Sequence, residues 1–363
     1  MSGSSARVAV NGYGVIGKRV ADAVRLQDDM TLVGVADVAT DYRIFPAVER
    51  GMPIYAATDT ALEPMRQAGL PLAGTLAELI GASDVVVDCT PKGIAAGNLE
   101  RYAKTSCKVI FQGGEKHAMT GLSFIASLNY ADALDADLLR VVSCNTTALG
   151  RVVGTLYRAG LVRTARAVLF RRGTDPWESH LNAPLNTVVP ETSTPSHQGP
   201  DLRTILPQLD IVTMAARGPF DLGHIHFAML ETSRPTTVVE VRDLLAAAPR
   251  VAFIRADQGM AGQNSIVELM RDLGRPRADL WEVAVWEDAI AVRPDGGEVY
   301  LTYHVPNEAI VIPETIDAIR AMTRLETNGA RSMEKTDASL GIRRRFVGAG
   351  SLPAGIAVQP ERA

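Results

Sequence analysis

The sequence predicts an α/β protein with two parts: a Rossmann-type, doubly wound parallel sheet, and an α+β catalytic domain whose sheet is mostly antiparallel. A glycine-rich turn follows the first apolar run of the chain. Strand-like and helix-like segments then alternate over the first third, which is typical of a parallel sheet. Later strand candidates alternate polar and apolar residues, and this alternation suits a sheet that is buried on one side.

The first strand, at residues 8–10, leads into the turn GYGVIG at positions 12–17, and a helix is expected over about residues 15–27. The GxGxxG spacing between a strand and a helix indicates dinucleotide binding. Gly12 allows the tight turn, Gly14 lets the backbone approach a pyrophosphate, and Gly17 lets the helix pack closely on the strand. The phosphates are expected at the helix N-terminus.

The second strand, at residues 31–36, is closed by Asp37, twenty positions after Gly17. A carboxylate at this place accepts hydrogen bonds from the adenosine ribose hydroxyls and repels a 2′-phosphate. We therefore expect NAD as the preferred cofactor. NADP remains possible because Arg43 lies close by in the sequence.

Buried strands are expected next at residues 84–89, 108–111 and 139–142, with helices near 75–80 and 94–104. Cys144 follows the last of these strands, and helical spacing begins at Thr147. A thiol before a helix N-terminus has a lowered pKa and can act as a nucleophile, whereas a free cysteine is otherwise a small buried hydrophobe. Backbone N–H groups at Asn145 and Thr146 are candidates to stabilise an oxyanion.

The later segment carries strand candidates at 165–170, 211–214, 224–231, 282–286 and 299–304, and a C-terminal helix over 314–325. His224 and His226 fall on one face of their strand, but no third residue has convincing spacing for a metal, so none is predicted. Two segments contain candidate anion-binding residues, which suggests a phosphorylated substrate. They are Arg171-Arg172-Gly173-Thr174-Asp175 and Ser196-His197-Gln198-Gly199-Pro200-Asp201.

Composition excludes several classes of protein. The 363 residues are 47% hydrophobic and 21% charged, and the net charge is -4. This charge predicts no basic surface for binding nucleic acid. No apolar stretch approaches the roughly 20 residues that span a bilayer, and three cysteines do not make a disulfide framework. We expect a cytoplasmic protein with no nucleic-acid or membrane partner, in which the short run Arg343-Arg344-Arg345 lies in a solvated tail.

Six motifs, distributed in matching order over residues 6–342, carry a family resemblance: NGYGVIGKRVADAV, FQGGEKH, SCNTTALGR, RRGTDP, PSHQGPD and IVIPETIDAIRAM. The chain resembles the archaeal-type (type II) glyceraldehyde-3-phosphate dehydrogenases. The resemblance implies oxidation of glyceraldehyde 3-phosphate with NAD(P) and phosphate to 1,3-bisphosphoglycerate, through a thioester on the cysteine of SCNTT. It also implies a homotetramer.

The resemblance assigns roles to individual residues. Cys144 is the nucleophile, and the base belongs to a His-x-His motif, in which we favour His224 over His226. Asn307 replaces a glutamine that usually lies near the nicotinamide. The other positions that line the cofactor are Val15, Ile16, Gly114 and Arg172. Those around the substrate are Ser143, Asn145, His197 and Gln198.

The expected domains are a dinucleotide-binding domain at 1–143, completed by about 305–342, a catalytic domain at 144–304, and a tail at 343–363. The sequence departs from the family at Phe220 and Asp221, where threonines are usual, and at Gln198, where a second histidine is usual. Three alternatives therefore stay open: a paralogue acting on another phosphorylated aldehyde or a semialdehyde, a non-phosphorylating enzyme, and a non-catalytic NAD-binding regulatory protein.

Overall fold

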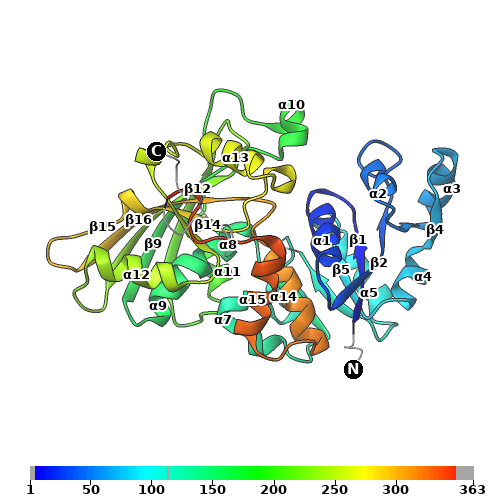
Figure 1. Ribbon diagram of the computed structural model, residues 1–363, viewed down its shortest axis with the longest axis horizontal. Coiled ribbons are helices and arrows are strands. Elements are labelled where there is room, and N and C mark those ends of the chain that lie inside the picture. The colour runs from blue at the N-terminus through cyan, green and yellow to red at the C-terminus, as the bar shows by residue number, and fades with distance from the viewer. Residues whose placement is uncertain (1–4, 113, 349–363) are drawn as a thin grey trace, which may run out of the picture.

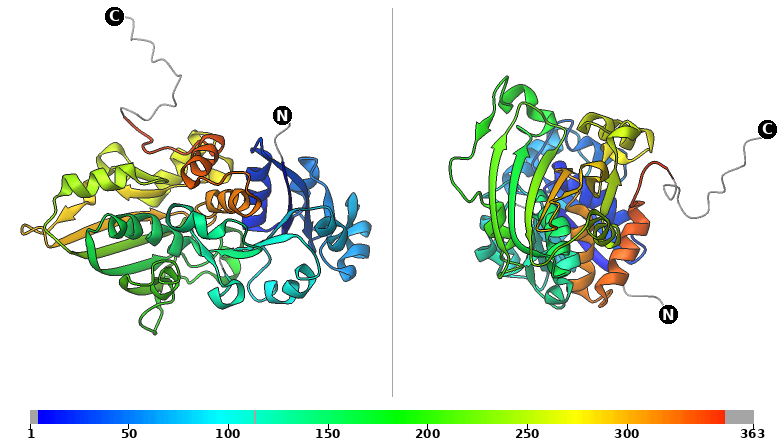
Figure 2. Two further views of the ribbon diagram at one scale, coloured as in Figure 1. Left: turned by 90° about the horizontal axis from the view of Figure 1, so that it is seen from below. Right: turned by 90° about the vertical axis from the view of Figure 1, so that its left-hand side faces the viewer.

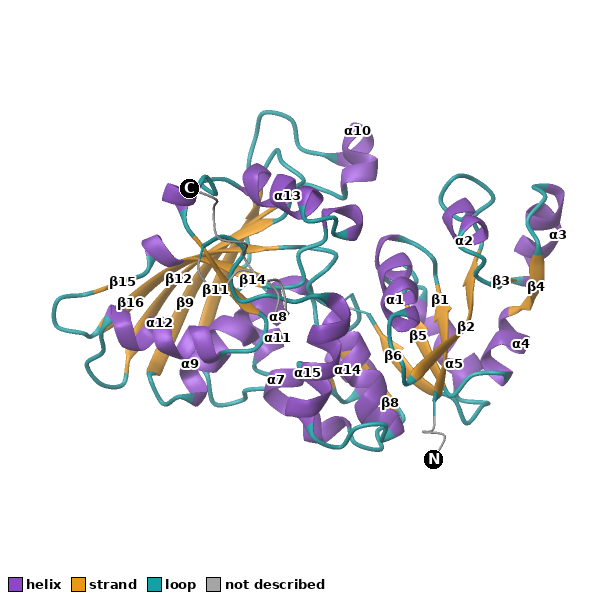
Figure 3. Ribbon diagram, in the orientation of Figure 1, coloured by secondary structure: helices purple, strands orange, loops and turns teal. Residues whose placement is uncertain are grey.

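The computed structural model describes residues 5–112 and 114–348 of the chain, which form two domains, each built on one sheet (Figure 1). Helices α14 (Ile312–Thr323) and α15 (Gly329–Leu340) lie between the two sheets (Figure 3). In the described part of the chain, no helix is long and apolar enough to cross a membrane.

The first sheet has eight strands in the order β4-β3-β2-β1-β5-β6-β8-β7, all paired in parallel. The predicted doubly wound sheet is confirmed, and its order reverses between β1 and β5, where such sheets bind ligands. The strands are β1 (Ala6–Asn11), β2 (Met30–Asp37), β3 (Ile54–Ala56), β4 (Leu72–Thr75), β5 (Val85–Asp88), β6 (Lys108–Phe111), β7 (Ser123–Phe124) and β8 (Leu138–Val141). The helices are α1 (Val15–Arg25), α2 (Phe45–Glu49), α3 (Asp59–Gln67), α4 (Leu76–Gly81), α5 (Ala95–Tyr102), α6 (His117–Thr120) and α7 (Ala126–Asn129).

The second sheet follows the order β10-β11-β9-β12-β16-β14-β13, with β15 paired to β16. It is mixed and mostly antiparallel, as predicted; β9 with β11 and β13 with β14 are its parallel pairs. The strands are β9 (Val162–Arg171), β10 (Val189–Pro190), β11 (Asp210–Arg217), β12 (His224–Thr232), β13 (Val251–Ile254), β14 (Val283–Trp286), β15 (Ala291–Val292) and β16 (Glu298–Val305). The helices are α8 (Cys144–Leu149), α9 (Thr155–Arg158), α10 (Ser179–Asn182), α11 (Gln198–Leu202), α12 (Val238–Ala247) and α13 (Gln263–Asp272).

The two faces of the second sheet differ. Helices α8, α9, α11 and α12 contact its strands from the inner side, and the strands form the outside of the molecule (Figure 2). Three large apolar side chains, Val168, Met214 and Phe227, are exposed on adjacent strands. They are also in register, because Val168 is paired with both Met214 and Phe227.

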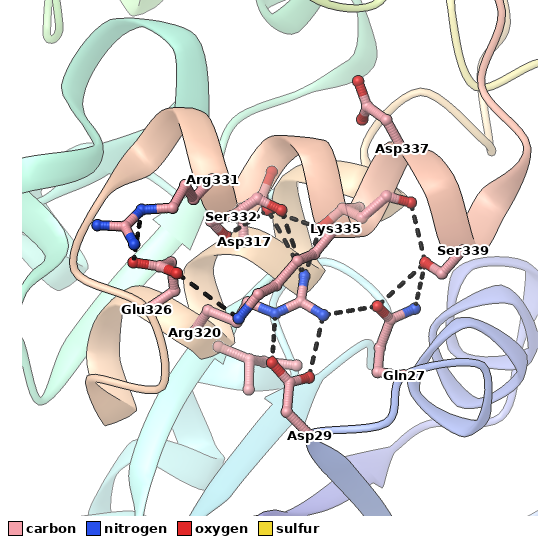
Figure 4. Close-up of polar contacts among 12 residues, drawn as sticks. Gln27, Asp29, Asp317, Arg320, Glu326, Arg331, Ser332, Lys335, Asp337 and Ser339 are labelled. Atoms are coloured by element: carbon pink, nitrogen blue, oxygen red, sulfur yellow. Dashed lines mark hydrogen bonds and ion pairs between the residues drawn. The ribbon is translucent and has the colours of Figure 1, made fainter. Parts of the chain in front are cut away.

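The C-terminal helices return to the first domain, where α14 contacts α1, β6 and β8. The buried guanidinium of Arg320 donates through Nε and Nη2 to the carboxylate of Asp29, at 2.8 and 3.0 Å (Figure 4). Its Nη2 also donates to Gln27 Oε1 at 2.7 Å, and its Nη1 donates to Thr336 Oγ1 at 2.6 Å. A single side chain of α14 therefore links α15 to the residues that connect α1 with β2.

The expectation of a solvated tail is wrong for residues 344–346, whereas Val347 is exposed. The backbone N–H of Phe253 donates to Arg344 O at 2.9 Å, and Arg345 forms an ion pair with Glu287 at 2.8 Å. Phe346 is buried against the second sheet, and this burial holds the segment in place. Residues 349–363 of the predicted tail lie outside the described residues.

Candidate active site

The three glycines of the first turn occupy positions that admit no side chain or leave room for a ligand. Gly12 has φ +93°, and a Cβ there would lie 2.9 Å from the backbone of Cys89. A Cβ on Gly17 would lie 1.8 Å from the carbonyl oxygen of Gly12. A Cβ on Gly14, the N-cap of α1, would meet nothing within 4 Å. The turn thus fits a dinucleotide whose phosphates approach the backbone at Gly14, with Val15 and Ile16 in the first helical turn beside them.

Asp37 orders this turn from the end of β2. Its Oδ2 accepts from the backbone N–H of Tyr13 at 2.6 Å, and its Oδ1 accepts from those of Val38 and Ala39 at 2.7 and 2.8 Å. Arg43 is paired with Asp41 at 2.8 Å, so its charge is already matched. The Asp37 carboxylate therefore orders the glycine turn, in addition to any contact with a ribose.

Cys144 is the first residue of α8, three residues before the predicted start of helical spacing, because the side chain of Ser143 caps the helix by accepting from Thr146 N at 3.3 Å. Thr146 is fully buried, and its Oγ1 donates to Asp201 Oδ2 at 2.9 Å. The N–H and the hydroxyl of Thr146 are thus both occupied by hydrogen bonds within the protein, to Ser143 and Asp201. Of the two predicted oxyanion donors, the Asn145 N–H favours negative charge on the sulfur, because it lowers the pKa of Cys144.

Three polar groups meet at the carboxyl edge of the first sheet. Cys144 Sγ lies 3.5 Å from His224 Nε2 and 3.2 Å from Asn307 Oδ1. His224 Nε2 lies 2.6 Å from the same oxygen of Asn307. On the other side of the ring, the backbone N–H of Arg172 donates to His224 Nδ1 at 3.0 Å. The nucleophile and base candidates, which are 80 residues apart in the chain, are therefore neighbours.

His226 lies deeper. It is fully buried, and its Nε2 lies 2.8 Å from Asn145 Oδ1. Asn145 in turn donates through Nδ2 to Cys144 Sγ at 3.6 Å. His226 thus reaches the thiol only through the Asn145 side chain.

The environment of the thiol opposes ionisation. Burial raises the pKa of Cys144 to about 11, although Arg172, Arg171 and the Asn145 N–H act in the opposite direction. The lowered pKa expected from the helix N-terminus is therefore outweighed by desolvation. Burial, with Arg172 second, holds the pKa of His224 well below its usual range, and burial lowers the pKa of His226 to about 3. All three groups are neutral near pH 7.

Comparison with known proteins places these residues in one family. Residues 143–288 match the family described as "Glyceraldehyde 3-phosphate dehydrogenase, C-terminal domain". The chain is 44% identical to "Glyceraldehyde-3-phosphate dehydrogenase 1" of Methanosarcina barkeri, over 94% of this chain and 99% of that protein. The chain belongs to the glyceraldehyde-3-phosphate dehydrogenase family. It is also 44% identical to "Glyceraldehyde-3-phosphate dehydrogenase" of Methanococcoides burtonii, over 93% of this chain and 99% of that protein. It is 43% identical to the protein of the same name from Methanobrevibacter smithii, over 92% of this chain and 99% of that protein.

Within this dehydrogenase fold, the predicted anion-binding residues differ in what they can offer a ligand. The buried guanidinium of Arg172 is held by Asp175, from the same predicted segment, and at 2.6 Å by Glu308, which sequence reasoning missed. Arg171 pairs with Glu191, and its buried Nε has no partner among the described residues. Neither amide atom of the buried Gln198 has a partner among those residues either.

Other predicted residues lie around the site. His197 is the N-cap residue of α11, and partial desolvation of its ring, followed by the charge of Arg171, lowers its pKa. Gly114 follows β6, where a Cβ would lie 3.5 Å from the Lys92 side chain. Among the residues that the structure describes, no group of three or more His, Cys, Asp or Glu side chains could hold a metal ion.

Proposed function

We propose that this chain is a phosphorylating glyceraldehyde-3-phosphate dehydrogenase of glycolysis, converting glyceraldehyde 3-phosphate and phosphate to 1,3-bisphosphoglycerate with NAD(P). The observation that carries the proposal is the position of the Cys144 thiol. It lies at the start of α8, 3.5 Å from His224 Nε2 and at the edge of a sheet with a dinucleotide turn. The relatives that share about 43% identity over most of the chain bear this enzyme's name.

The chemistry proceeds on the sulfur of Cys144. As a thiolate, the sulfur adds to the aldehyde carbon, and the carbonyl oxygen takes up the proton that the thiol has lost, which gives a thiohemiacetal. The hydroxyl group of the thiohemiacetal then loses its proton, and the carbon that bears this hydroxyl loses a hydride. The product is a thioester. An oxygen of phosphate then attacks the thioester carbonyl, which releases an acyl phosphate and restores the thiolate. The bound nicotinamide supplies the hydride acceptor.

His224 is the proposed base for the hydroxyl proton. Its Nε2 is the ring atom nearest the sulfur, whereas His226 Nε2 is directed to Asn145. The Asn145 N–H, next to the sulfur, is the proposed donor to the oxygen that carries negative charge in the addition step.

The proposed cofactor is NAD, held by Gly12, Gly14, Gly17 and the first turn of α1. The charge of Asp37 at the end of β2 supports the choice of NAD, because a 2′-phosphate there would meet a carboxylate. Gly114, Arg172 and Asn307 remain proposed contacts near the nicotinamide. For Arg172, the ion pairs to Glu308 and Asp175 mean that the contact would compete with two carboxylates.

The proposed substrate site uses Ser143, Asn145, Arg171, His197 and Gln198. Arg171 supports an anionic substrate because one of its buried donors is unsatisfied by the described residues. Gln198 offers a neutral amide where the family usually has a histidine. This difference also favours a second candidate, a paralogue that acts on a related phosphorylated aldehyde.

The chain is also proposed to form a homotetramer that uses the outer face of the second sheet. Val168, Met214 and Phe227 expose apolar surface in register on three neighbouring strands. Such surface is buried at interfaces between copies of a chain. The division into domains at 1–143, 144–304 and about 305–342 and the cytoplasmic location also stay proposals.

The test is an initial-rate assay that follows reduced nicotinamide at 340 nm, with glyceraldehyde 3-phosphate as substrate. We expect a rate that depends on inorganic phosphate and that is higher with NAD than with NADP. A rate independent of phosphate would point to the non-phosphorylating alternative, in which water attacks the thioester. A bound cofactor without turnover of this or a related phosphorylated aldehyde would leave the regulatory alternative.

A further inference from the structure

The two arginines at the end of β9 differ in what they can offer an anionic ligand. Arg172 is buried, its Nη1 donates to Glu308 Oε1 at 2.6 Å, and its Nη2 is paired with Asp175. Both of its Nη atoms are therefore engaged by carboxylates. Arg171 has one acidic partner, Glu191, and its buried Nε has no hydrogen-bond partner among the described residues. An anionic ligand is therefore expected at Arg171 rather than at Arg172.

Arg171 lies within electrostatic reach of the proposed reactive groups. Burial has the largest effect on the pKa values of Cys144, His224 and His197, and the positive charge of Arg171 acts on all three by lowering them. On the pKa of His197, the carboxylate of Glu191 acts in the opposite direction. A phosphate group that replaced Glu191 on Arg171 would therefore change the charge felt by the thiol of Cys144 and by the ring of His197.

We propose that Glu191 sets the affinity of the substrate site for phosphate groups: its carboxylate occupies the guanidinium of Arg171 in the ligand-free protein, and a phosphate group must displace it to bind there. This inference rests on the proposed assignment of Arg171 to the substrate site. The phosphate group can be that of a phosphorylated aldehyde or inorganic phosphate, because both present anionic oxygens that match the donors of a guanidinium.

The backbone of Glu191 is fixed, whereas its side chain has room to move. Glu191 follows β10, and its backbone N–H donates to Ala215 O of β11 at 2.9 Å. The side chains of Arg171 and Glu191 are 24% and 27% exposed, so a change of rotamer can take the carboxylate into water. The displaced carboxylate still lies near the bound phosphate and repels it. Glu191 therefore lowers the affinity for phosphate both by occupying the guanidinium and by its charge.

The experiment measures phosphate binding to the full-length protein without cofactor or aldehyde, at pH 8 and constant ionic strength. The probes are inorganic phosphate and glycerol 3-phosphate, a phosphate ester without an aldehyde. Either probe should slow iodoacetamide alkylation of Cys144, because a phosphate on Arg171 cancels a charge that favours the thiolate. The concentration dependence of this protection gives an apparent Kd. In Glu191→Gln, which is nearly isosteric, the apparent Kd should fall about 5- to 20-fold for the probe that binds at Arg171.

Two controls accompany this variant. Glu231 pairs with Arg163, at the opposite end of β9, so Glu231→Gln removes a similar ion pair and should leave the apparent Kd unchanged. In an Arg171→Met background, the further change Glu191→Gln should alter the apparent Kd by less than about twofold.

A gain in Glu191→Gln with glycerol 3-phosphate alone would assign Arg171 to the ester, and a gain with inorganic phosphate alone would assign it to the second substrate. The proposal is overturned if neither probe binds Glu191→Gln more tightly than the wild type, or if the gain persists without the Arg171 guanidinium. Because no step requires turnover, either result is independent of whether the chain oxidises glyceraldehyde 3-phosphate.

Discussion

His226 Nε2 and Asn145 Oδ1 lie 2.8 Å apart, and both residues are buried. This hydrogen bond orients the Asn145 amide so that its Nδ2 is directed at Cys144 Sγ. The second histidine of the His-x-His pair therefore acts on the site through Asn145, while the first contacts the thiol directly.

Replacement of the two histidines should separate these roles. Loss of a general base typically costs about 10² to 10⁴ in rate, so His224→Asn should lower kcat by a factor in that range. His226→Asn should mainly lower stability or raise KM, because it removes the partner of Asn145 and leaves a buried amide unsatisfied. Steady-state kinetics and thermal melts measure both effects, and a larger kcat loss in His226→Asn would reverse the assignment.

The proposed role of Cys144 as the nucleophile can be tested separately from the role of His224. Cys144→Ser should abolish turnover yet leave NAD binding largely intact, because the glycine turn lies between β1 and α1, whereas Cys144 begins α8. Titration calorimetry with NAD checks the second part. Residual turnover near the original rate would exclude the covalent mechanism.

The raised thiol pKa predicts a particular pH dependence in the ligand-free protein. With a pKa of about 11 for Cys144, only about 10⁻⁴ of the thiol is ionised at pH 7. Iodoacetamide alkylation should then rise about tenfold per pH unit up to about pH 10. Cys144 should still react faster than Cys107, whose pKa burial raises to about 12, and faster than Cys89, whose pKa burial also raises. A plateau below pH 8 would contradict the raised pKa.

Cofactor preference depends on Asp37. Asp37→Ser removes the charge that repels a 2′-phosphate, so the ratio of kcat/KM for NAD over NADP should fall. The same change leaves one shorter hydroxyl where two carboxylate oxygens accept from the N–H groups of Tyr13, Val38 and Ala39, so KM for NAD should also rise. A wild-type protein that already prefers NADP would show that the carboxylate serves only to order the turn.

The Arg320 pair offers a stability test with a matched control on the neighbouring helix. Arg320→Met leaves the Asp29 carboxylate, which is largely buried, without its partner and should cost about 3–5 kcal/mol in the free energy of unfolding. Arg331→Met removes the contact of an exposed arginine with Glu326 at 3.9 Å. This variant should change the free energy of unfolding by less than about 1 kcal/mol. Urea unfolding measures both, and equal effects would mean that the buried pair contributes no more than the surface pair.

Local patterns in the sequence were enough to predict the two-sheet architecture, the glycine turn and most strands of both sheets. Periodicity reflects which face of an element is buried, and Gly12 and Gly17 are required by close backbone contacts. The strand β13 was not predicted, because a short apolar run such as its VAFI cannot be distinguished from a buried helix segment by periodicity alone.

Tertiary structure decided the properties of the site. That Cys144 is neutral depends on the desolvation of its sulfur, and the contact of this sulfur with Asn307 joins residues that are 163 positions apart in the chain. Likewise, the pairing of Arg172 with Glu308 depends on the distance between side chains from two separate segments. The sequence by itself determined which chemical groups are present and on which elements they lie. Their protonation, partners and availability were decided by the fold, because burial and hydrogen bonding arise only when distant segments pack together.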